Sequence, residues 1–360
     1  MSTQHMIPLW SAGVLTALWL CLLLKVSRHK VAAKGFAGFW LAMLSWPLLL
    51  VSELWQLVGA ASPLLTAAAV VALPVLLAGV YRNLLAMLWR KPKPALWPFY
   101  VAGIGLLVLV VIQGWLHASD WQQWPGFAPV GEPLKYWAVY FSCLIATFLF
   151  LYICIVWVEH LQQYHYELPL QVVDTEMFQI KGLSGACGFA VGMAFCLAVI
   201  VAAVAFGFLP FANWLSWFHL SLALTTLILL VQLARKHSPS PSPFDHEALS
   251  AAPKMSQATA QAVLKRAEAA VISQKAYKEI GLTLTRFAER AGMSASDICL
   301  ALLAAKKSHF RGFIYQYRMK YAKQVLMSSD AKLDSVTKRL KLGVNGTASR
   351  SFLKYLENRR

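Results

Sequence analysis

The chain has 360 residues, of which 58% are hydrophobic and only 14% are charged. Soluble domains are roughly a quarter charged, so the composition excludes an ordinary soluble globular protein. Residues 1–253 carry 12 Lys/Arg and 9 Asp/Glu, whereas residues 254–360 carry 21 and 7, so the second part holds +14 of the formal net charge of +17. One chain therefore joins an apolar part to a strongly basic part.

Long runs without a charged residue dominate the apolar part. About 20 apolar helical residues cross the ~30 Å core of a bilayer. The last run has 53 residues, about 80 Å as one helix, so we expect it to turn at Pro210 and to cross twice. The sequence therefore predicts an all-α, seven-transmembrane helix bundle over residues 1–236. The runs are 2–24, 35–52, 54–81, 94–119, 136–158 and 182–234.

Basic residues in the short loops predict the orientation, because Lys and Arg beside membrane helices stay on the cytoplasmic side. Three basic loops, separated by even numbers of crossings, place the N-terminus outside and the basic part in the cytoplasm. The same count places the mostly acidic loop 159–181 in the cytoplasm. The basic loops contain Lys25, Arg28, Lys30 and Lys34, then Arg82, Arg90, Lys91 and Lys93, and finally Arg235 and Lys236.

Three histidines are candidates for sensing a signal. His219 lies about two turns inside the seventh expected helix, where a titratable group could respond to protons or a ligand. The alternative is a neutral histidine bonded to a neighbouring helix. His160 and His165 lie beside Glu159 and Glu167, but this spacing fits no strong metal-ligand pattern, and an interfacial polar cluster is the alternative. The six cysteines form no CxxC pair. We expect neither a metal nor a cofactor.

A boundary follows the apolar part. Residues 237–253 read HSPSPSPFDHEALSAAP, and repeated Ser-Pro favours an extended spacer over a helix. Residues 254–281 are predicted to form a connector helix, with a weak apolar stripe of Ala258, Ala262, Ala269 and Tyr277. This helix would either couple the membrane part to the basic part or stand as a solvated helix.

From residue 282 onward the pattern predicts short amphipathic helices. Thr283 or Thr285 can cap a helix that carries Phe287 inward and ends at Gly292, since glycine suits the left-handed residue that closes a helix. Ser294 is expected to cap the next helix. Two short helices joined by a tight turn make a helix-turn-helix. A long helix at 310–327, a short helix near 333–340, a turn at 343–346 and a final helix at 347–356 complete the pattern.

Two stretches carry a resemblance to a known family. LTLTRFAERAGMSASDI, at 282–298, and HFRGFIYQYRMKYAKQVL, at 309–326, resemble the DNA-binding domain of AraC/XylS-type transcription regulators, in which a long helix joins two helix-turn-helix units. The resemblance extends over residues 282–355 and implies an AraC-like DNA-binding domain at 282–360. It implies no function for the apolar helices. The second helix of the first unit departs from the family because Cys299 and Leu300 stand where polar or basic side chains are usual.

The expected function is that of a membrane-embedded, one-component transcription regulator in the inner membrane of a bacterium. Its bundle would sense a membrane or extracytoplasmic signal. Two half-sites on DNA would need either two heads, as in a homodimer, or one head that uses both of its units. The alternative is a membrane adaptor whose degenerate helix-turn-helix contacts a protein or the lipid surface. No nucleophile motif or phosphate loop indicates an enzyme. The candidate DNA contacts are Ser294, Ser296, Lys306, Lys307, His309, Arg311, Asn345, Thr347, Arg350 and Lys354.

Overall fold

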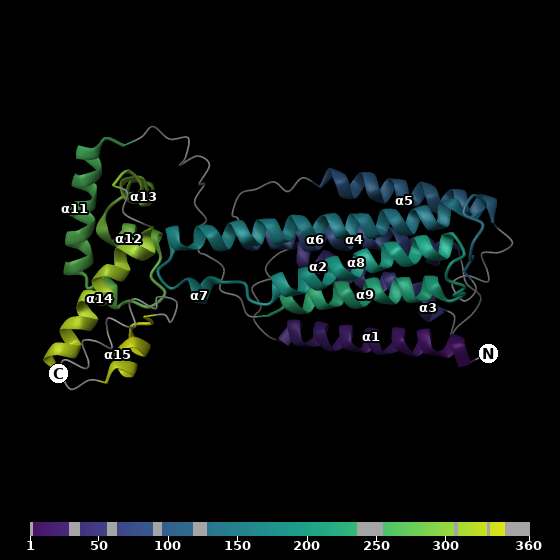
Figure 1. Ribbon diagram of the computed structural model, residues 1–360, viewed down its shortest axis with the longest axis horizontal. Helices are drawn as coiled ribbons and strands as arrows, with labels where there is room; N and C mark the ends of the chain where they lie inside the picture. The colour runs from purple at the N-terminus through teal and green to yellow at the C-terminus, as the bar shows by residue number, and fades with distance from the viewer. Residues whose placement is uncertain are drawn as a thin grey trace. The chain divides into compact units, whose positions relative to one another are not determined.

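The computed structural model describes residues 3–28, 37–55, 63–88, 96–117, 128–235, 255–305, 309–329 and 332–342. Within these ranges every regular element is a helix, and the extended backbone includes one isolated bridge between Val172 and Thr283. The chain divides into two compact units, whose helices are labelled in Figure 1. We call Met1–Gln162 with Ile180–His237 the apolar unit, and Gln163–Gln179 with Ser238–Arg360 the head.

The helices of the apolar unit lie side by side along their length (Figure 1). Among the described residues, six helices are long and apolar enough to cross a membrane: α1, α4, α5, α6, α8 and α9. The elements are α1 (Thr3–Arg28), α2 (Ala37–Ser45), η2 (Trp46–Leu50), α3 (Val51–Trp55), α4 (Pro63–Leu88), α5 (Trp97–Leu116), α6 (Trp137–Gln171), α8 (Leu183–Ala205) and α9 (Trp214–Leu233).

Of the seven predicted spans, six appear as continuous apolar helices within the described residues. The second expected span is broken into α2, the 3₁₀ segment η2 and α3. Pro47 lies in the first turn of η2, and proline has no N–H to continue the α-helical hydrogen bonds. The turn expected at Pro210 is confirmed, because α8 ends at Ala205 and α9 begins at Trp214.

Small residues let α2 and α4 pack backbone against backbone. A Cβ atom added to Gly38 would lie 2.5 Å from the carbonyl oxygen of Gly79. One added to Gly79 would lie 2.7 Å from the carbonyl oxygen of Gly38. Such close approach is a common way for apolar helices to associate in membranes. The hydrophobic effect does not drive their association there, because lipid tails are as apolar as the side chains. The break at Pro47 therefore does not detach α2 from the bundle.

The head contains two hydrophobic cores. The larger core joins α11 (Gln257–Ser273), α12 (Leu284–Ala291), α13 (Ala295–Ala304) and the start of α14 (Phe310–Ser328). The smaller core joins the end of α14 to α15 (Leu333–Arg339). The 3₁₀ turn η4 (Ala276–Lys278) leads from α11 toward α12, and α7 (Thr175–Phe178) also belongs to the head.

The apolar stripe expected on the connector helix is wrong for its three alanines, whereas Tyr277, in η4, is half-buried and packs against the larger core. Ala258, Ala262 and Ala269 are exposed on α11, whereas its buried residues are Ala260, Leu264, Ala267 and Val271. The two large aliphatic residues, Leu264 and Val271, decide which face turns inward, because each buries more apolar area than an alanine. This face packs in the larger core, so α11 is part of the folded head. The expected Ser-Pro linker at 237–253 lies outside the described residues.

Candidate functional site

Two short helices, α12 and α13, are joined by a tight turn where the sequence predicted the first helix-turn-helix unit. The Oγ1 atom of Thr283 accepts a hydrogen bond from the N–H of Arg286 at 3.3 Å and caps α12. Gly292 has φ 61° and ψ 38°, the left-handed conformation that closes the helix. Phe287 and Ile298 are fully buried between the two helices and the rest of the larger core. The cap, the glycine and the inward residues are as the sequence predicted.

The role expected for Ser294 is wrong in detail. Ser294 occupies the N-cap position of α13, but its side chain makes no capping hydrogen bond. Its Oγ atom lies 2.6 Å from the Oγ atom of Ser296 instead. The hydroxyl is therefore used by a neighbouring side chain, so both serines meet at the exposed start of α13.

The outer face of α13 is poor in groups that read DNA. Leu303 is 53% exposed, Asp297 is exposed and Leu300 is half-buried. Base edges are read by hydrogen-bond donors and acceptors, and a carboxylate repels phosphate. The first unit alone therefore offers weak chemistry for sequence recognition.

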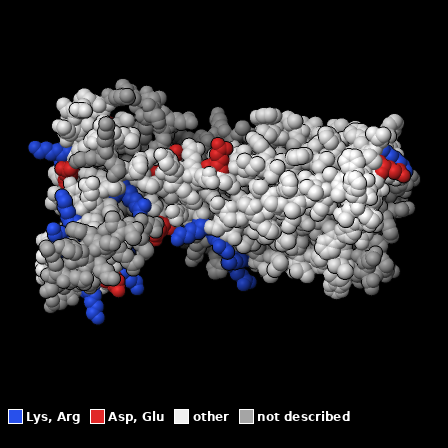
Figure 2. All heavy atoms as spheres, viewed as in Figure 1, with Lys and Arg blue, Asp and Glu red and all other residues white. Residues whose placement is uncertain are grey.

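Basic side chains are spread over the head, and Figure 2 shows several of them on its visible surface. Of the predicted DNA contacts, His309 is exposed just before α14 and Arg311 is half-buried in its first turn. The other predicted basic contacts and the second unit lie outside the described residues: Lys306, Lys307, Asn345, Thr347, Arg350 and Lys354. The exposed described cations of the head are Lys265, Arg266, Lys275, Lys278, Arg286, Arg290, Lys320, Lys323, Lys332, Lys338, Arg339 and Lys341.

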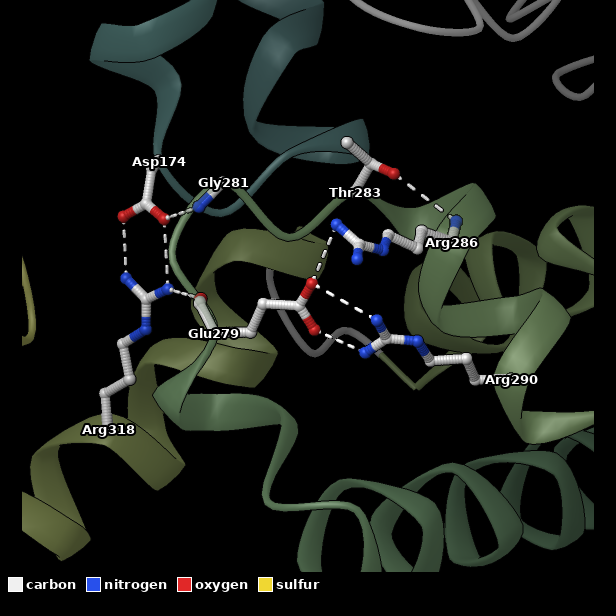
Figure 3. A network of polar contacts seen from close by, with 7 residues as sticks. All are labelled: Asp174, Glu279, Gly281, Thr283, Arg286, Arg290 and Arg318. Atoms are coloured by element: carbon white, nitrogen blue, oxygen red, sulfur yellow. Dashed lines mark hydrogen bonds and ion pairs between the residues drawn. The ribbon is translucent and has the colours of Figure 1, made fainter.

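Two arginines on α12 share one carboxylate, an arrangement that the sequence pattern did not reveal. Arg286 Nη1 lies 2.9 Å from Oε1 of Glu279, and Arg290 Nη1 pairs with Oε2 of the same residue (Figure 3). Both arginines remain exposed. Glu279 therefore neutralises part of the positive charge that α12 presents.

A buried ion pair lies at the centre of the head (Figure 3). Arg318, on α14, is 1% exposed and pairs with both oxygens of Asp174, at 2.7 and 3.0 Å. Its other N–H bonds go to the carbonyl oxygens of Tyr277 at 2.9 Å, Glu279 at 2.6 Å and Leu340 at 3.3 Å. A guanidinium has five N–H donors, so all are used.

Asp174 was not expected to reach this position. It lies between α6 and α7, 144 residues before Arg318 in the sequence, and local spacing carries no signal for such a pair. Its Oδ2 atom also accepts a hydrogen bond from the N–H of Gly281 at 2.7 Å. Removing one partner of a buried ion pair typically costs about 3–5 kcal/mol, so the contact is a structural requirement of the head.

In the apolar unit, His219 pairs with a residue that the sequence analysis did not single out. Its Nδ1 atom lies 2.9 Å from Oε1 of Glu53 in α3, and both side chains are buried. His160 donates from Nδ1 to the carbonyl oxygen of Val156 at 2.7 Å. His165, half-buried beside the ring of Tyr164, belongs to the head. The three expected sensing histidines therefore form no single cluster.

A small cavity lies beside His219. It is lined by Gln113, Ser142, Cys143, His219 and apolar side chains, and water centres can occupy about 30 Å³ of it. One buried water needs ~10–15 Å³, so about two fit. The Nε2 atom of Gln113 donates to Ala138 O at 2.8 Å and to Ser142 Oγ at 3.1 Å. The described residues contain no group of three or more His, Cys, Asp or Glu that could hold a metal.

Comparisons of the chain with protein-family models, with curated proteins and with solved structures find no match. The fold defines the class at a coarse level. Within the described residues, the chain is a helical protein with six apolar helices that could cross a membrane, and its head contains the two short helices α12 and α13 joined by a tight turn.

Proposed function

We propose that the chain is a membrane-embedded, one-component transcription regulator whose head binds promoter DNA. The observation that carries the proposal is the pair α12 and α13, with a Thr283 cap, a left-handed Gly292 and a shared core. The resemblance of residues 282–355 to AraC/XylS-type regulators supports it, as does the excess of Lys and Arg in the head. Each phosphate that a cation neutralises releases counterions and strengthens binding at low salt.

Within this proposal the two helix-turn-helix units have different tasks. The first unit does not read bases; its exposed arginines Arg286 and Arg290, together with His309 and Arg311, hold the head on the DNA backbone. The second unit reads bases through Asn345, Thr347 and Arg350, whose side chains have the hydrogen-bonding chemistry required. A second copy of the chain would supply the other half-site, one helical turn or a multiple away.

We place the protein in the inner membrane of a bacterium, with its N-terminus outside and its head in the cytoplasm. This orientation counts the broken segment α2–η2–α3 as a crossing. Lys25 and Arg28 end α1, and Arg235 lies close to Gly182, at the start of α8. Basic residues at the end of α1, the start of α8 and the end of α9 support a cytoplasmic location for these three helix ends.

A binding measurement on the full-length protein tests the proposal. The protein, held in lipid nanodiscs, is mixed with randomised DNA, and bound sequences are selected and titrated at low and moderate salt. We expect one preferred sequence, a steep fall of affinity with salt, and a relaxed preference in Arg350→Ala. The full chain is needed because Asp174, outside 254–360, pairs with Arg318. Equal affinity for unrelated polyanions, unchanged by Arg350→Ala, would reject the proposal.

The outer face of α13 favours a second candidate, a membrane adaptor that contacts another protein. Leu303 and Leu300 present apolar surface there, beside Asp297. The substitution Leu303→Arg separates the two candidates. If α13 faces DNA phosphates, the added cation raises affinity and steepens the salt dependence. If α13 faces a protein, DNA affinity stays at the wild-type value.

A further inference from the structure

The end of α6 and most of the segment between α6 and α8 belong to the head, although the rest of α6 and all of α8 belong to the apolar unit. Residues Gln163–Gln179 group with the head. The N–H of Val173 donates to the carbonyl oxygen of Leu282 at 3.1 Å, and Val172 forms an antiparallel bridge with Thr283. The side chain of Val173 is part of the larger core. We call residues 172–174, which make these contacts, the seated segment.

Asp174 supplies the counter-charge for Arg318 from the N-terminal of the two segments that make up the head. Among the described residues it is the ion-pair partner of Arg318, and backbone carbonyl groups fill the remaining N–H donors. Removing the carboxylate leaves a guanidinium that is 1% exposed without a counter-charge, which strongly destabilises a buried site. The interior of the head is therefore electrostatically complete only when the seated segment is in place.

The contacts of Asp174 and Arg318 converge on the stretch 277–283, which immediately precedes α12 (Figure 3). Arg318 holds the carbonyl groups of Tyr277 and Glu279, and Asp174 holds the N–H of Gly281. Gly281 has φ 73°, a conformation that glycine adopts without strain. The bridge partner of Val172 is Thr283, which caps α12. The seated segment therefore sets where the helix-turn-helix begins.

We propose that Asp174 is a positioning residue for the helix-turn-helix, and that the seated segment is the input through which the apolar unit controls the head. α6 is one helix from Trp137 to Gln171, so the seated segment directly continues a helix long enough to cross a membrane. With the segment seated, α12 is ordered and the head is competent. With the segment displaced, Arg318 loses its counter-charge and α12 its anchor. The consequence for DNA rests on the proposed function, whereas the effect on α12 does not.

Hydrogen exchange of the full-length protein in nanodiscs tests the effect on α12. Asp174→Asn keeps the size of the side chain but removes its charge and turns one acceptor into a donor. We expect amides of Leu284–Ala291 to exchange at least tenfold faster in this variant. Glu176→Gln is the matched control, because Glu176 is an exposed carboxylate two residues away, and it should exchange like the wild type. Wild-type exchange of α12 in Asp174→Asn would overturn the proposal.

A disulfide gives an independent test of the seated segment. Residues paired across an antiparallel bridge have Cα atoms ~4.5–5.5 Å apart, within the range that a disulfide spans. Val172→Cys with Thr283→Cys should therefore cross-link in the full-length protein under mild oxidation. When Asp174→Asn is added to these two cysteine substitutions, the oxidised protein should recover slow exchange of the α12 amides. The same protein after reduction should not. Absence of the cross-link would overturn the proposal.

DNA titration of the same samples separates this inference from the proposed function. If the cross-link forms and restores slow exchange of α12 while no DNA sequence is preferred, the role of the seated segment is supported and the transcription function is rejected. If DNA binding is specific but Asp174→Asn changes neither exchange nor affinity, the function stands and the input fails. If the transcription function and the role of the seated segment are both correct, Asp174→Asn should lower DNA affinity at least tenfold. Oxidation of the cysteine pair should then restore the wild-type affinity.

Discussion

The Nδ1 atom of His219 lies 2.9 Å from the Oε1 atom of Glu53, and this contact joins α9 to α3 across 166 residues of sequence. His219 is 7% exposed and Glu53 only 1%. Ionisable groups in an apolar bundle persist when they are paired. α9 is the last described helix before residues 237–253. The contact between His219 and Glu53 therefore holds α9, the helix that leads toward the basic part of the chain, in the bundle.

Replacing both partners of this pair should destabilise the bundle by less than the sum of the two single replacements. We expect Glu53→Gln and His219→Gln each to lower the free energy of unfolding by about 1–3 kcal/mol, because each disrupts a buried polar contact. The double variant should cost less than the sum, with a coupling of about 0.5–3 kcal/mol. Thermal unfolding in detergent, followed by tryptophan fluorescence, measures all three.

An exposed ion pair of the same unit is the control for this cycle. Glu132 and Lys135 are 3.2 Å apart, with side chains that are 62% and 56% exposed. Solvent screens such pairs, so Glu132→Gln should leave the unfolding temperature unchanged. Strictly additive effects of Glu53→Gln and His219→Gln would show that the two buried side chains do not act as a pair.

The contact between Gly38 and Gly79 predicts opposite outcomes for two Gly→Ala substitutions. At Gly79 a Cβ would meet the carbonyl oxygen of Gly38 at 2.7 Å, so the backbones must separate, at a cost of about 1–3 kcal/mol. At Gly192, in the middle of α8, nothing lies within 4 Å of the added atom, and alanine should stabilise the helix by up to ~1 kcal/mol. Unfolding temperatures compare the two variants. Equal shifts would refute close packing of α2 on α4.

Local patterns in the sequence were enough to predict the elements that depend on neighbouring residues. Runs of apolar residues located four of the six continuous spans, α1, α5, α8 and α9, to within a few residues, and Pro210 located the turn between α8 and α9. Gly292 located the turn of the helix-turn-helix because only a few residue types adopt the left-handed conformation cheaply. These features rest on hydropathy and backbone preference, which a short window of sequence contains.

Features that depend on distant partners could not be predicted in this way. The inward face of α11 was misassigned because alanines lie on both sides of the helix, and packing against α13 selects Leu264 and Val271. The pairing of Asp174 with Arg318 joins residues 144 apart, and Glu53 with His219 joins residues 166 apart. No periodicity links such positions, so the two buried polar contacts emerge only from the fold.

The thiol of Cys299 should be unreactive while the head is folded. Cys299 is buried in α13, and burial raises its pKa above the ordinary value for a cysteine. Because only the thiolate attacks an alkylating reagent, a raised pKa means less thiolate at any given pH near neutrality, and reactivity should increase only at higher pH. Iodoacetamide labelling followed by mass spectrometry measures this rate.

An exposed cysteine on the same helix provides the reference for that rate. Leu303→Cys places a thiol at a position that is 53% exposed, and it should react at the rate of an unfolded peptide. Cys299 in the wild type should react at least tenfold more slowly, and denaturant should remove the difference. Equal labelling of the two positions under native conditions would mean that α13 does not pack as described.

Glu279 should restrain DNA binding by holding the two arginines of α12. Glu279→Gln releases Arg286 and Arg290 from a shared carboxylate, and freed cations near phosphates release more counterions. We expect DNA affinity at low salt to rise about three- to tenfold, with a steeper dependence on salt. Stability should change little, since ion pairs with exposed arginines contribute little. Glu289→Gln is the matched control, because it removes the same charge from an exposed position of α12 itself. An equal gain in both variants would reflect net charge alone and would place the α12 arginines away from the DNA.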